Sequence, residues 1–400
     1  MTKKIIAHLV NYSRSNHTSG GGIRSFLEEM LINDKMKAYD HVFLSMAPEN
    51  PDPISLSLDG YRDLVCPLPD LSFIPSYRLS RRLKPLVWSW QLKETIKNKG
   101  IDLLHSHVPD YLDGQVHAAK LINLPFIWTV HGYSGNHKYV LSQKSNIGRG
   151  LRQMRPDQQI TSVVSVATGR TLAQDHPIIA DKFVVTYGGA STKRLNRTIT
   201  RSSDWYVPYF LPQPDTVVFG TLARLSKEKR LDLMVRAFSQ FLNENVSEDK
   251  RSLFHLLIAG TGDEGENLEQ IIKESHLCEN IHLIGFQEDV SRFLRQIDIF
   301  LLSSDAEGFP IALIEAMYMG VPVISTNAGG ISEILTNSES SGGILVNMGD
   351  VAGFQKALTQ SIDPTWRYVM SAHAQTKAEN FTVKQTSEAF DNLYQKLLKG

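Results

Sequence analysis

Cysteine is nearly absent from this 400-residue chain, which contains only Cys66 and Cys278, far apart in sequence. Two such cysteines offer neither a disulfide framework nor a cysteine-based metal site. Long apolar runs are also missing, since no window approaches about 18 uninterrupted apolar residues, so we expect no transmembrane helix. The first apolar stretch spans about six residues, which is too short for the core of a signal peptide. We therefore expect a cytoplasmic protein.

The chain has no net charge, because 42 basic residues balance 42 acidic ones, but the two signs are unevenly distributed. Residues 1–201 carry a balance of +10, and residues 202–400 carry a balance of −10. Opposite halves of this size suggest two domains with different partners, the first of which faces something anionic. Drift in surface composition is the alternative explanation.

Short β-rich apolar runs alternate with helical patterns along the whole chain, as in parallel sheets that carry helices on both faces. Two separate sets of strands predict an α/β fold with two doubly wound, Rossmann-like domains, whose sheets face each other across a cleft. The predicted strands are 5–10, 41–47, 102–107, 125–130, 162–167 and 182–186, then 216–222, 255–259, 281–284, 297–302, 321–325 and 343–346. Helices are predicted over 231–242, 265–275 and 311–319.

These elements divide the chain into a first domain over residues 1–195 and a second over 215–365. Residues 196–214 are the expected linker. Residues 366–400 are expected to form C-terminal helices, broken near Asn380, that could return to the first domain.

Glu315 is the most informative acidic residue, because its neighbours make the predicted helix 311–319 apolar all round and so predict burial. A lone buried carboxylate is costly unless it is hydrogen-bonded, and ligand hydroxyls could supply those bonds. An exposed position or an internal arginine partner is the alternative. Pro310 suits the start of this helix, and Gly308 would let a ligand approach the backbone. The free N–H groups around Phe309 would then favour an anion.

Two loops after predicted strands could bind phosphate. Arg224 and Lys229 lie between a strand and a helix, where two cations can neutralise a diphosphate without a metal, although such residues are more often simply solvated. The glycine-rich turn around Gly21 and Gly22 follows the first strand and could cradle phosphate. It matches neither the dinucleotide fingerprint nor a P-loop, because Ser25 stands in the place of the last glycine and no Gly-Lys-Ser/Thr follows.

Histidines end two predicted strands of the first half: His105 and His107 end one, and His131 ends the next. No carboxylate or further ligand stands at a spacing typical of zinc, so a metal site is disfavoured. Each imidazole could be satisfied within the fold, or it could hydrogen-bond a sugar hydroxyl.

The second half resembles the retaining family-4 glycosyltransferases with the GT-B architecture. The resemblance rests on Glu307 and Glu315, eight positions apart within EGFPIALIEAMYMGVPV, and on the segments ARLSKEK, LLIAGTGDE, IHLIGF and GGILV. In the first half, GGGI, HSH and TVHG fit more loosely. The chain departs from the family at Tyr187-Gly188-Gly189, where many relatives have Pro-Asn-Gly, and at Ala223, where they have Gly.

The resemblance implies a role for each matching residue. Glu315 would hold the ribose of a nucleotide-sugar donor, UDP- or GDP-linked, and Glu307 would contact the transferred sugar. Arg224 and Lys229 would neutralise the diphosphate in place of a metal ion or other cofactor. The remaining contacts implied are Gly262 and Phe286 around the base, Gly308, Phe309 and Pro310 at the helix start, Gly21 and Gly22 on the phosphates, and His131 on the sugar.

The implied activity is hexosyl transfer, with retained anomeric configuration, to a polysaccharide or lipid-linked acceptor of the cell envelope. A nucleotide-sugar 2-epimerase, a phosphorylase and a degenerate sugar-nucleotide-binding subunit are the alternatives. A phosphorylase usually needs pyridoxal phosphate on a lysine, and no lysine has a recognisable setting for it. Retention of both glutamates and both cations argues against a degenerate subunit.

Two basic segments of the first half are interleaved with apolar and aromatic residues, which favours an anionic membrane surface over nucleic acid, whose binding motifs are lacking. A solvated basic surface is the alternative. We expect peripheral attachment to the cytoplasmic face of the inner membrane. The first segment contains Arg78, Arg81, Arg82, Lys84, Lys93, Lys97 and Lys99 with Trp88 and Trp90, and the second contains Lys138, Lys144, Arg149, Arg152 and Arg155 with Ile147, Leu151 and Met154.

Overall fold

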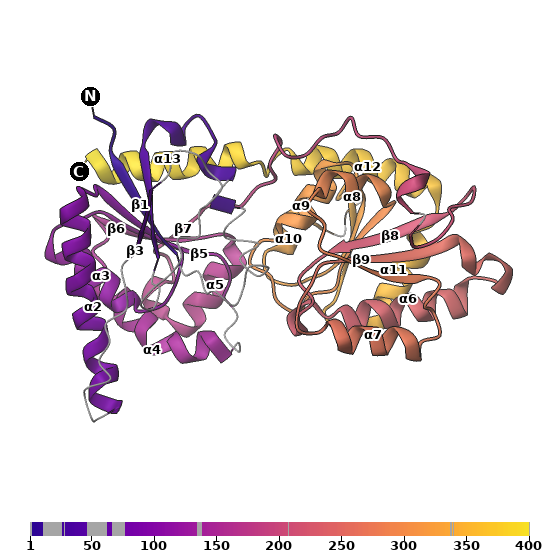
Figure 1. Cartoon of the computed structure of the whole chain (residues 1–400), viewed down its shortest axis with the longest axis horizontal. Coiled ribbons are helices and arrows are strands. Elements are labelled where there is room, and N and C mark those ends of the chain that lie inside the picture. Colours follow the sequence, from indigo (N-terminus) through magenta and orange to yellow (C-terminus); the bar gives the residue numbers. More distant parts are fainter. Residues whose placement is uncertain are drawn as a thin grey trace. The chain divides into compact units, whose positions relative to one another are not determined.

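The structure is a computed structural model that describes residues 2–10, 26–27, 29–45, 62–65, 77–133, 138–206, 208–336, 338 and 340–399. The chain folds into two compact units, coloured along the sequence in Figure 1. Unit 1 contains residues 1–187 together with 384–400, and unit 2 contains residues 188–383. Both are α/β units built on a parallel sheet, as the strand–helix alternation predicts.

Unit 1 contains a seven-stranded parallel sheet in the order β3-β2-β1-β4-β5-β6-β7. Its strands are β1 (Ile5–Val10), β2 (Asp40–Ser45), β3 (Arg62–Val65), β4 (Leu103–Ser106), β5 (Phe126–Val130), β6 (Gln159–Val163) and β7 (Phe183–Val185). Its described helices include α2 (Tyr77–Lys99), α3 (Leu112–Leu121), α4 (Lys138–Gln153) and α5 (Val166–Asp175), together with α13 (Val383–Lys399) from the end of the chain.

Two strands of unit 1 differ from the prediction. The edge strand β3 was not predicted, because two of its four residues are charged and it carries no apolar run. β6 begins earlier than predicted and ends at Val163, because Ser165 caps α5: its side chain accepts a hydrogen bond from the backbone N–H of Thr168 at 3.1 Å.

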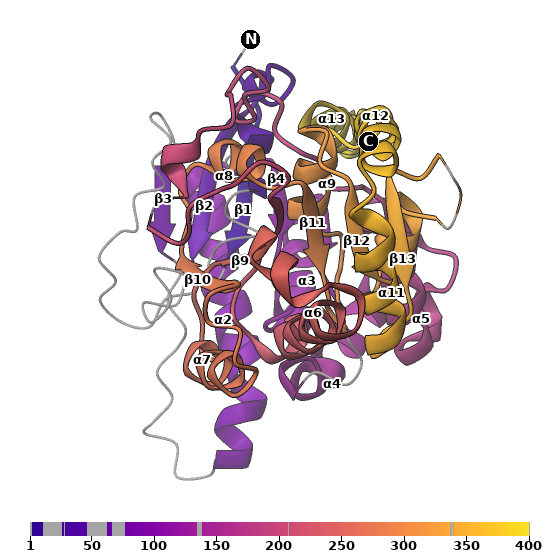
Figure 2. The same ribbon diagram turned by 90° about the vertical axis from the view of Figure 1, so that its right-hand side faces the viewer.

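Unit 2 contains a six-stranded parallel sheet in the order β10-β9-β8-β11-β12-β13, and the prediction of all six strands is confirmed to within a few residues. Figures 1 and 2 show α6, α7 and α11 on one face of this sheet and α8, α9 and α12 on the other. The strands are β8 (Val217–Leu222), β9 (Phe254–Ala259), β10 (Ile281–Gly285), β11 (Ile299–Leu302), β12 (Val323–Thr326) and β13 (Gly343–Val346). The helices are α6 (Leu231–Asn245), α7 (Gly265–Glu274), α8 (Val290–Gln296), α9 (Ile311–Tyr318), α10 (Ile331–Ile334), α11 (Val351–Ser361) and α12 (Pro364–Ala378).

Residues 196–214, expected as a linker, pack within unit 2 against α8 and the start of β11. The backbone N–H of Asn196 donates to Ser291 Oγ at 2.9 Å, and Arg201 forms a bidentate ion pair with Asp298. Tyr206 is buried and its hydroxyl donates to the carbonyl of Gln296. These contacts explain why a stretch rich in arginine, serine and threonine is ordered here.

The two C-terminal helices belong to different units. α12 packs on α9 in unit 2, where Ser371 Oγ donates to the carbonyl of Gly320 at 2.6 Å. α13 lies on the face of the first sheet opposite α2, α3 and α4 (Figure 1) and adds apolar side chains to a core shared with β1 and β4. Tyr39 also donates to Asp391 at 2.6 Å. The apolar residues of α13 in this core are Phe390, Leu393, Tyr394 and Leu397.

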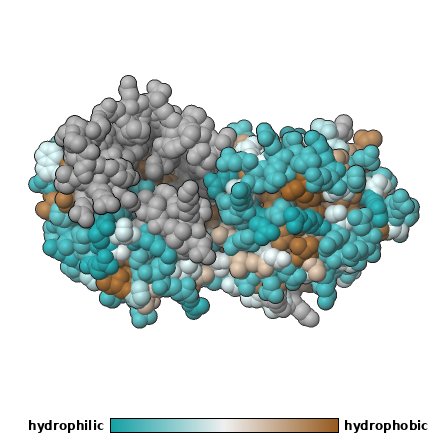
Figure 3. Space-filling model, turned by 90° about the horizontal axis from the view of Figure 1, so that it is seen from below, coloured by the Kyte–Doolittle hydropathy of each residue, from teal (hydrophilic) through white to brown (hydrophobic). Residues whose placement is uncertain are grey.

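Among the described helices, none is long and apolar enough to cross a membrane. The face drawn in Figure 3 is mostly hydrophilic outside the grey atoms, and its hydrophobic residues form small separate patches.

The packing of α13 predicts that unit 1 depends on the last residues of the chain. Phe390 is completely buried, so we expect Phe390→Ala to lower the free energy of unfolding of unit 1 by about 3–5 kcal/mol through lost burial and a residual cavity. Urea unfolding followed by tryptophan fluorescence measures this change. Asn392→Ala, at an exposed position of the same helix, is the control. Equal stability of the two variants would contradict the packing described.

Candidate active site

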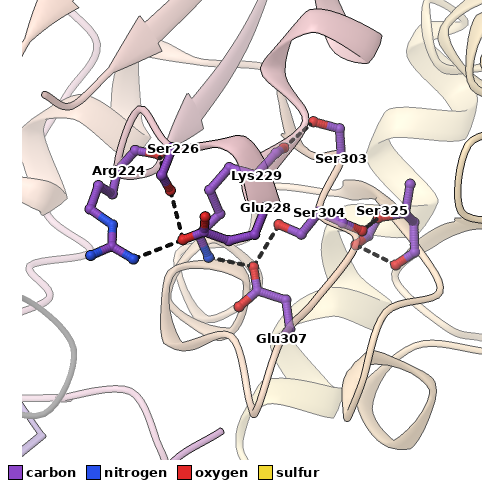
Figure 4. Close-up of polar contacts among 9 residues, drawn as sticks. Arg224, Ser226, Glu228, Lys229, Ser303, Ser304, Glu307 and Ser325 are labelled. Carbon is purple, nitrogen blue, oxygen red and sulfur yellow. Dashed lines mark hydrogen bonds and ion pairs between the residues drawn. The ribbon is translucent and has the colours of Figure 1, made fainter. Parts of the chain in front are cut away.

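The loops after β8 and β11 meet in an ion pair at the carboxyl end of the sheet of unit 2, shown in Figure 4. Lys229 Nζ lies 2.6 Å from Glu307 Oε1. The two side chains are 21% and 10% exposed, so the pair is mostly shielded from water. β8 and β11 are neighbours in the sheet, which brings together two residues that are 78 positions apart in sequence.

Serine residues and a tight loop hold this pair in place. Ser304 Oγ donates to Glu307 Oε1 at 2.7 Å, and Ser303 Oγ donates to the carbonyl of Lys229 at 2.8 Å. Gly329, with φ of +54°, lies so close that a Cβ there would be 1.7 Å from the carbonyl oxygen of Glu307. The other oxygen of Glu307, Oε2, accepts no hydrogen bond from the described residues.

Arg224 lies on the same loop as Lys229 but is more exposed, at 52% of its side chain. Its Nη2 donates to Glu228 Oε1 at 2.7 Å, and Ser226 Oγ donates to the same oxygen at 2.7 Å. Burial alone would raise the pKa of Glu228, but the hydrogen bonds from Ser226, from its own backbone N–H and from Arg224 outweigh it and lower the pKa below its usual value. Glu228 is therefore ionised and aims the guanidinium of Arg224.

Gly262, a predicted base contact, supports the loop that carries Arg224. A Cβ on Gly262 would lie 2.3 Å from the carbonyl oxygen of Leu225, so only glycine lets the loop after β9 pack this closely on the loop after β8. The backbone of Leu225 donates to the carbonyl of Thr261 at 3.0 Å, and it accepts from Glu264 at 2.9 Å. Phe286, the other predicted base contact, directly follows β10 and is 68% exposed.

α9 begins at the residue predicted from the sequence. Pro310 is the N-cap of α9, and Glu315 is 8% exposed, so its predicted burial is confirmed. Gly308 lies in the loop that joins Glu307 to this helix. The side chain of Phe309 is buried and packs edge-on against Phe381, so in this structure it supports the loop rather than offering an exposed ring.

Unit 1 contains the predicted histidines. His131 is partly exposed after β5, and its Nε2 lies 2.9 Å from His107 Nδ1. His105 is completely buried, with its two ring nitrogens bonded to Tyr394 and Thr129 at 2.7 Å each. The predicted phosphate contacts Gly21 and Gly22 lie outside the described residues.

His8, which the sequence analysis did not single out, joins the predicted histidines, and with His105 and His107 it forms the one described cluster compact enough to hold a metal ion. Its signal in the sequence is a polar residue within the apolar run of β1. Glu228, Ser303 and Ser304 were also missed, although Ser303 and Ser304 directly follow β11, at a strand end where ligands bind.

The apolar residues of the second basic segment do not face a membrane as predicted, because they lie in the core of unit 1. Ile147 and Leu151, on the apolar face of α4, are 1% and 5% exposed because this face packs into the core of unit 1. Lys144 pairs with Asp175, which is also bonded by Tyr133. Arg149 Nε lies 2.8 Å from Asp113 Oδ2, so the charge of Arg149 is also partly neutralised within the unit.

Comparison with known proteins finds two matching family models. The model described as Glycosyltransferase Family 4 matches residues 35–194, and the model described as Glycosyl transferases group 1 matches residues 210–373. They cover most of the two sheets and include every predicted site residue of unit 2.

Curated relatives and solved structures point in the same direction. The amylovoran biosynthesis glycosyltransferase AmsK of Erwinia amylovora is 26% identical over 73% of this chain and 70% of that protein. An Escherichia coli UDP-Gal:α-D-GlcNAc-diphosphoundecaprenol α-1,3-galactosyltransferase is 27% identical, over 45% of this chain and 46% of its own length. The crystal structure of Anabaena HepE in complex with UDP has a TM-score of 0.78 at 17% identity, covering 98% of this chain and all of the other.

Proposed function

Because the chain belongs to the family-4 glycosyltransferases with the two-domain GT-B architecture, we propose that it transfers a sugar from a nucleotide-sugar donor to a glycan acceptor of the cell envelope, with retention of configuration and without a metal ion. The observation that carries the proposal is the Lys229–Glu307 pair at the carboxyl ends of β8 and β11. There a cation that can bind the diphosphate stands beside a carboxylate that can accept a hydrogen bond from a hydroxyl of the sugar.

In the proposed donor complex, Lys229 and Arg224 bind the diphosphate and stabilise the charge that develops on it as the glycosidic bond breaks. Glu307 and Glu228 balance these two cations and hold them in position, so little reorganisation is needed when the anion arrives. Glu307 Oε2 accepts a hydroxyl of the transferred sugar, and Glu315 binds the ribose. Phe286 and the loop at Gly262 are proposed to contact the nucleobase of the donor.

The proposed contacts of unit 1 with the donor follow from the family resemblance, and the proposed donor and acceptor classes follow from relatives. His131 is proposed to contact the transferred sugar, and Gly21 and Gly22 the phosphates. The name of the E. coli relative gives UDP-galactose as its donor and a lipid diphosphate sugar as its acceptor, and the HepE structure contains UDP. We therefore propose a UDP- or GDP-linked donor and a lipid-linked or polysaccharide acceptor for this chain.

Attachment to the cytoplasmic face of the membrane is proposed through α2. Leu86 and Trp90, four residues apart on this helix, are 56% and 57% exposed, whereas Trp88 is completely buried. Lys93 Nζ lies 5.9 Å from the centre of the Trp90 ring but is paired with Glu94 Oε1 at 2.9 Å. The exposed basic residues nearby on α2 are therefore Lys97 and Lys99. Exposed apolar residues beside lysines are typical of interfacial helices on anionic lipid.

The proposed diphosphate contacts predict loss of sugar transfer without loss of folding. Lys229→Met should lower kcat/KM by about 2–4 kcal/mol in transition-state free energy, because a charge-assisted contact to the leaving diphosphate disappears. Release of nucleoside diphosphate from a panel of nucleotide sugars, with and without lipid acceptor, is the measurement. Arg224→Ala and Glu315→Gln should lose comparable activity.

Lys227→Met is the matched control, since Lys227 is exposed on the same turn and has the same charge but no bond to Glu307. Equal losses in the Lys227 and Lys229 variants would reject a specific role for Lys229. Conversion of the donor to its 2-epimer without transfer to any acceptor would favour an epimerase, and donor binding without turnover would favour a degenerate binding subunit.

Chelation provides a separate prediction. If Arg224 and Lys229 replace a divalent ion, the rate of transfer should be unchanged after dialysis against EDTA. Abolition of activity by EDTA, with recovery on addition of manganese or magnesium, would contradict metal-free transfer. Thermal unfolding of the dialysed protein, monitored in parallel, distinguishes this outcome from loss of the fold.

Attachment through α2 predicts co-sedimentation with vesicles of anionic phospholipid, little binding to neutral vesicles, and release in high salt. The double change Leu86→Ser and Trp90→Ser should abolish most of this binding. Tyr368→Ser, which alters an even more exposed aromatic residue in unit 2, should leave this binding intact. Indifference of the wild-type protein to both vesicle types would reject the proposal and indicate a soluble acceptor.

A further inference from the structure

Four histidines of unit 1 form one continuous chain of hydrogen bonds that ends on a backbone carbonyl. His41 Nε2 lies 2.9 Å from the carbonyl oxygen of Met36, and His41 Nδ1 lies 2.9 Å from His8 Nε2. His8 Nδ1 lies 3.2 Å from His107 Nε2, and His107 Nδ1 lies 2.9 Å from His131 Nε2. The four residues lie on or just after β2, β1, β4 and β5, which are consecutive in the sheet, so the chain crosses it from strand to strand.

The chain leads from the interior of unit 1 to its surface. His8, His41 and His107 are 0%, 5% and 3% exposed, whereas His131 is partly exposed. Burial lowers the pKa of His8 and His107 well below the usual value and that of His41 to about 4, and it also lowers the pKa of His131. All four imidazoles are therefore neutral at physiological pH. A neutral imidazole has one nitrogen that donates and one that accepts.

The carbonyl at the inner end sets the direction of every bond. A carbonyl oxygen can only accept, so His41 carries its proton on Nε2 and accepts at Nδ1. His8 must then donate from Nε2 to His41 and accept at Nδ1. His107 must in turn donate from Nε2 to His8 and accept at Nδ1. His131 must therefore donate from Nε2 to His107 Nδ1, which leaves the Nδ1 of His131 unprotonated.

We propose that this chain locks His131 in its Nε2–H tautomer, so that its Nδ1 is an obligatory hydrogen-bond acceptor for the ligand. Such an atom binds a sugar hydroxyl, which can donate, and rejects a carboxylate or an acetamido carbonyl, which cannot. His8, His41 and His107 are positioning residues that act through His131. The identity of the ligand as a sugar rests on the proposed function, whereas the tautomer does not.

The alternative use of these histidines, a metal site at His8, His105 and His107, conflicts with their hydrogen bonds. These three side chains offer ligand atoms within 4.8 Å of one another. Both ring nitrogens of His105, however, are bonded to hydroxyl groups, and those of His8 and His107 are used in the chain. A metal ion would have to break at least one bond of each ring. His105 therefore stands outside the chain, although its ring centre is only 4.1 Å from that of His107.

Nitrogen-15 NMR of the wild-type protein, labelled at histidine, tests the proposal directly. At neutral pH, all four histidines should show a protonated Nε2 and an unprotonated Nδ1, and couplings through the N–H···N bonds should link the three histidine pairs in the stated order. Protonation of His131 at Nδ1, or absence of the coupling between His8 and His107, would overturn the proposal. This readout does not require activity, so failure of the proposed function would leave it intact.

Two variants connect the tautomer to transfer. His8→Phe interrupts the chain two residues from His131, and His131 should then show a mixture of tautomers, with kcat/KM for transfer reduced about tenfold. His105→Phe also removes a completely buried imidazole with two hydrogen bonds. This change should leave the His131 tautomer and kcat/KM for transfer unchanged. Equal effects of the two changes on the His131 tautomer would overturn the proposal. If His8→Phe does not fold, the couplings in the wild-type protein decide.

Discussion

The ion pair between Lys229 and Glu307 is the interaction on which the candidate site of unit 2 depends. Shielding two charges from water costs free energy that their attraction does not reliably repay, so such a pair is weak support for stability. Here the surrounding structure offsets that cost with bonds from Ser303 and Ser304 and with the close approach of Gly329. The arrangement is more easily understood as a prepared anion site in which the carboxylate holds the ammonium group until a diphosphate arrives.

Unit 1 orients its polar residues in a different way. Its buried histidines are neutral, and their orientation passes from ring to ring, starting at the carbonyl of Met36. Unit 2 uses paired charges that suit an anionic leaving group, whereas unit 1 uses neutral rings that suit hydroxyl groups.

The sequence predicted the fold closely where periodicity alone decides it, as in all six strands of unit 2, and less well where long-range contacts decide. The strand β3 was missed because it is short and charged, and α4 was placed at a membrane because its apolar face is next to basic residues. Only the fold shows that Ile147 and Leu151 point into the core. Lys229 and Glu307 were predicted individually, but their pairing, like the order of the histidine chain, depends on which strands are neighbours in the sheet.

The central claim, that Lys229 and Arg224 together recognise a diphosphate without a metal, is tested most directly by calorimetric titration in EDTA. UDP and GDP would be compared with UMP and GMP on the wild-type protein and on the double variant Lys229→Met, Arg224→Ala. We expect the preferred diphosphate to bind at least about tenfold more tightly than its monophosphate, and we expect this preference to vanish in the double variant. Retention of the preference in the double variant, or binding only after a divalent ion is added, would contradict the claim.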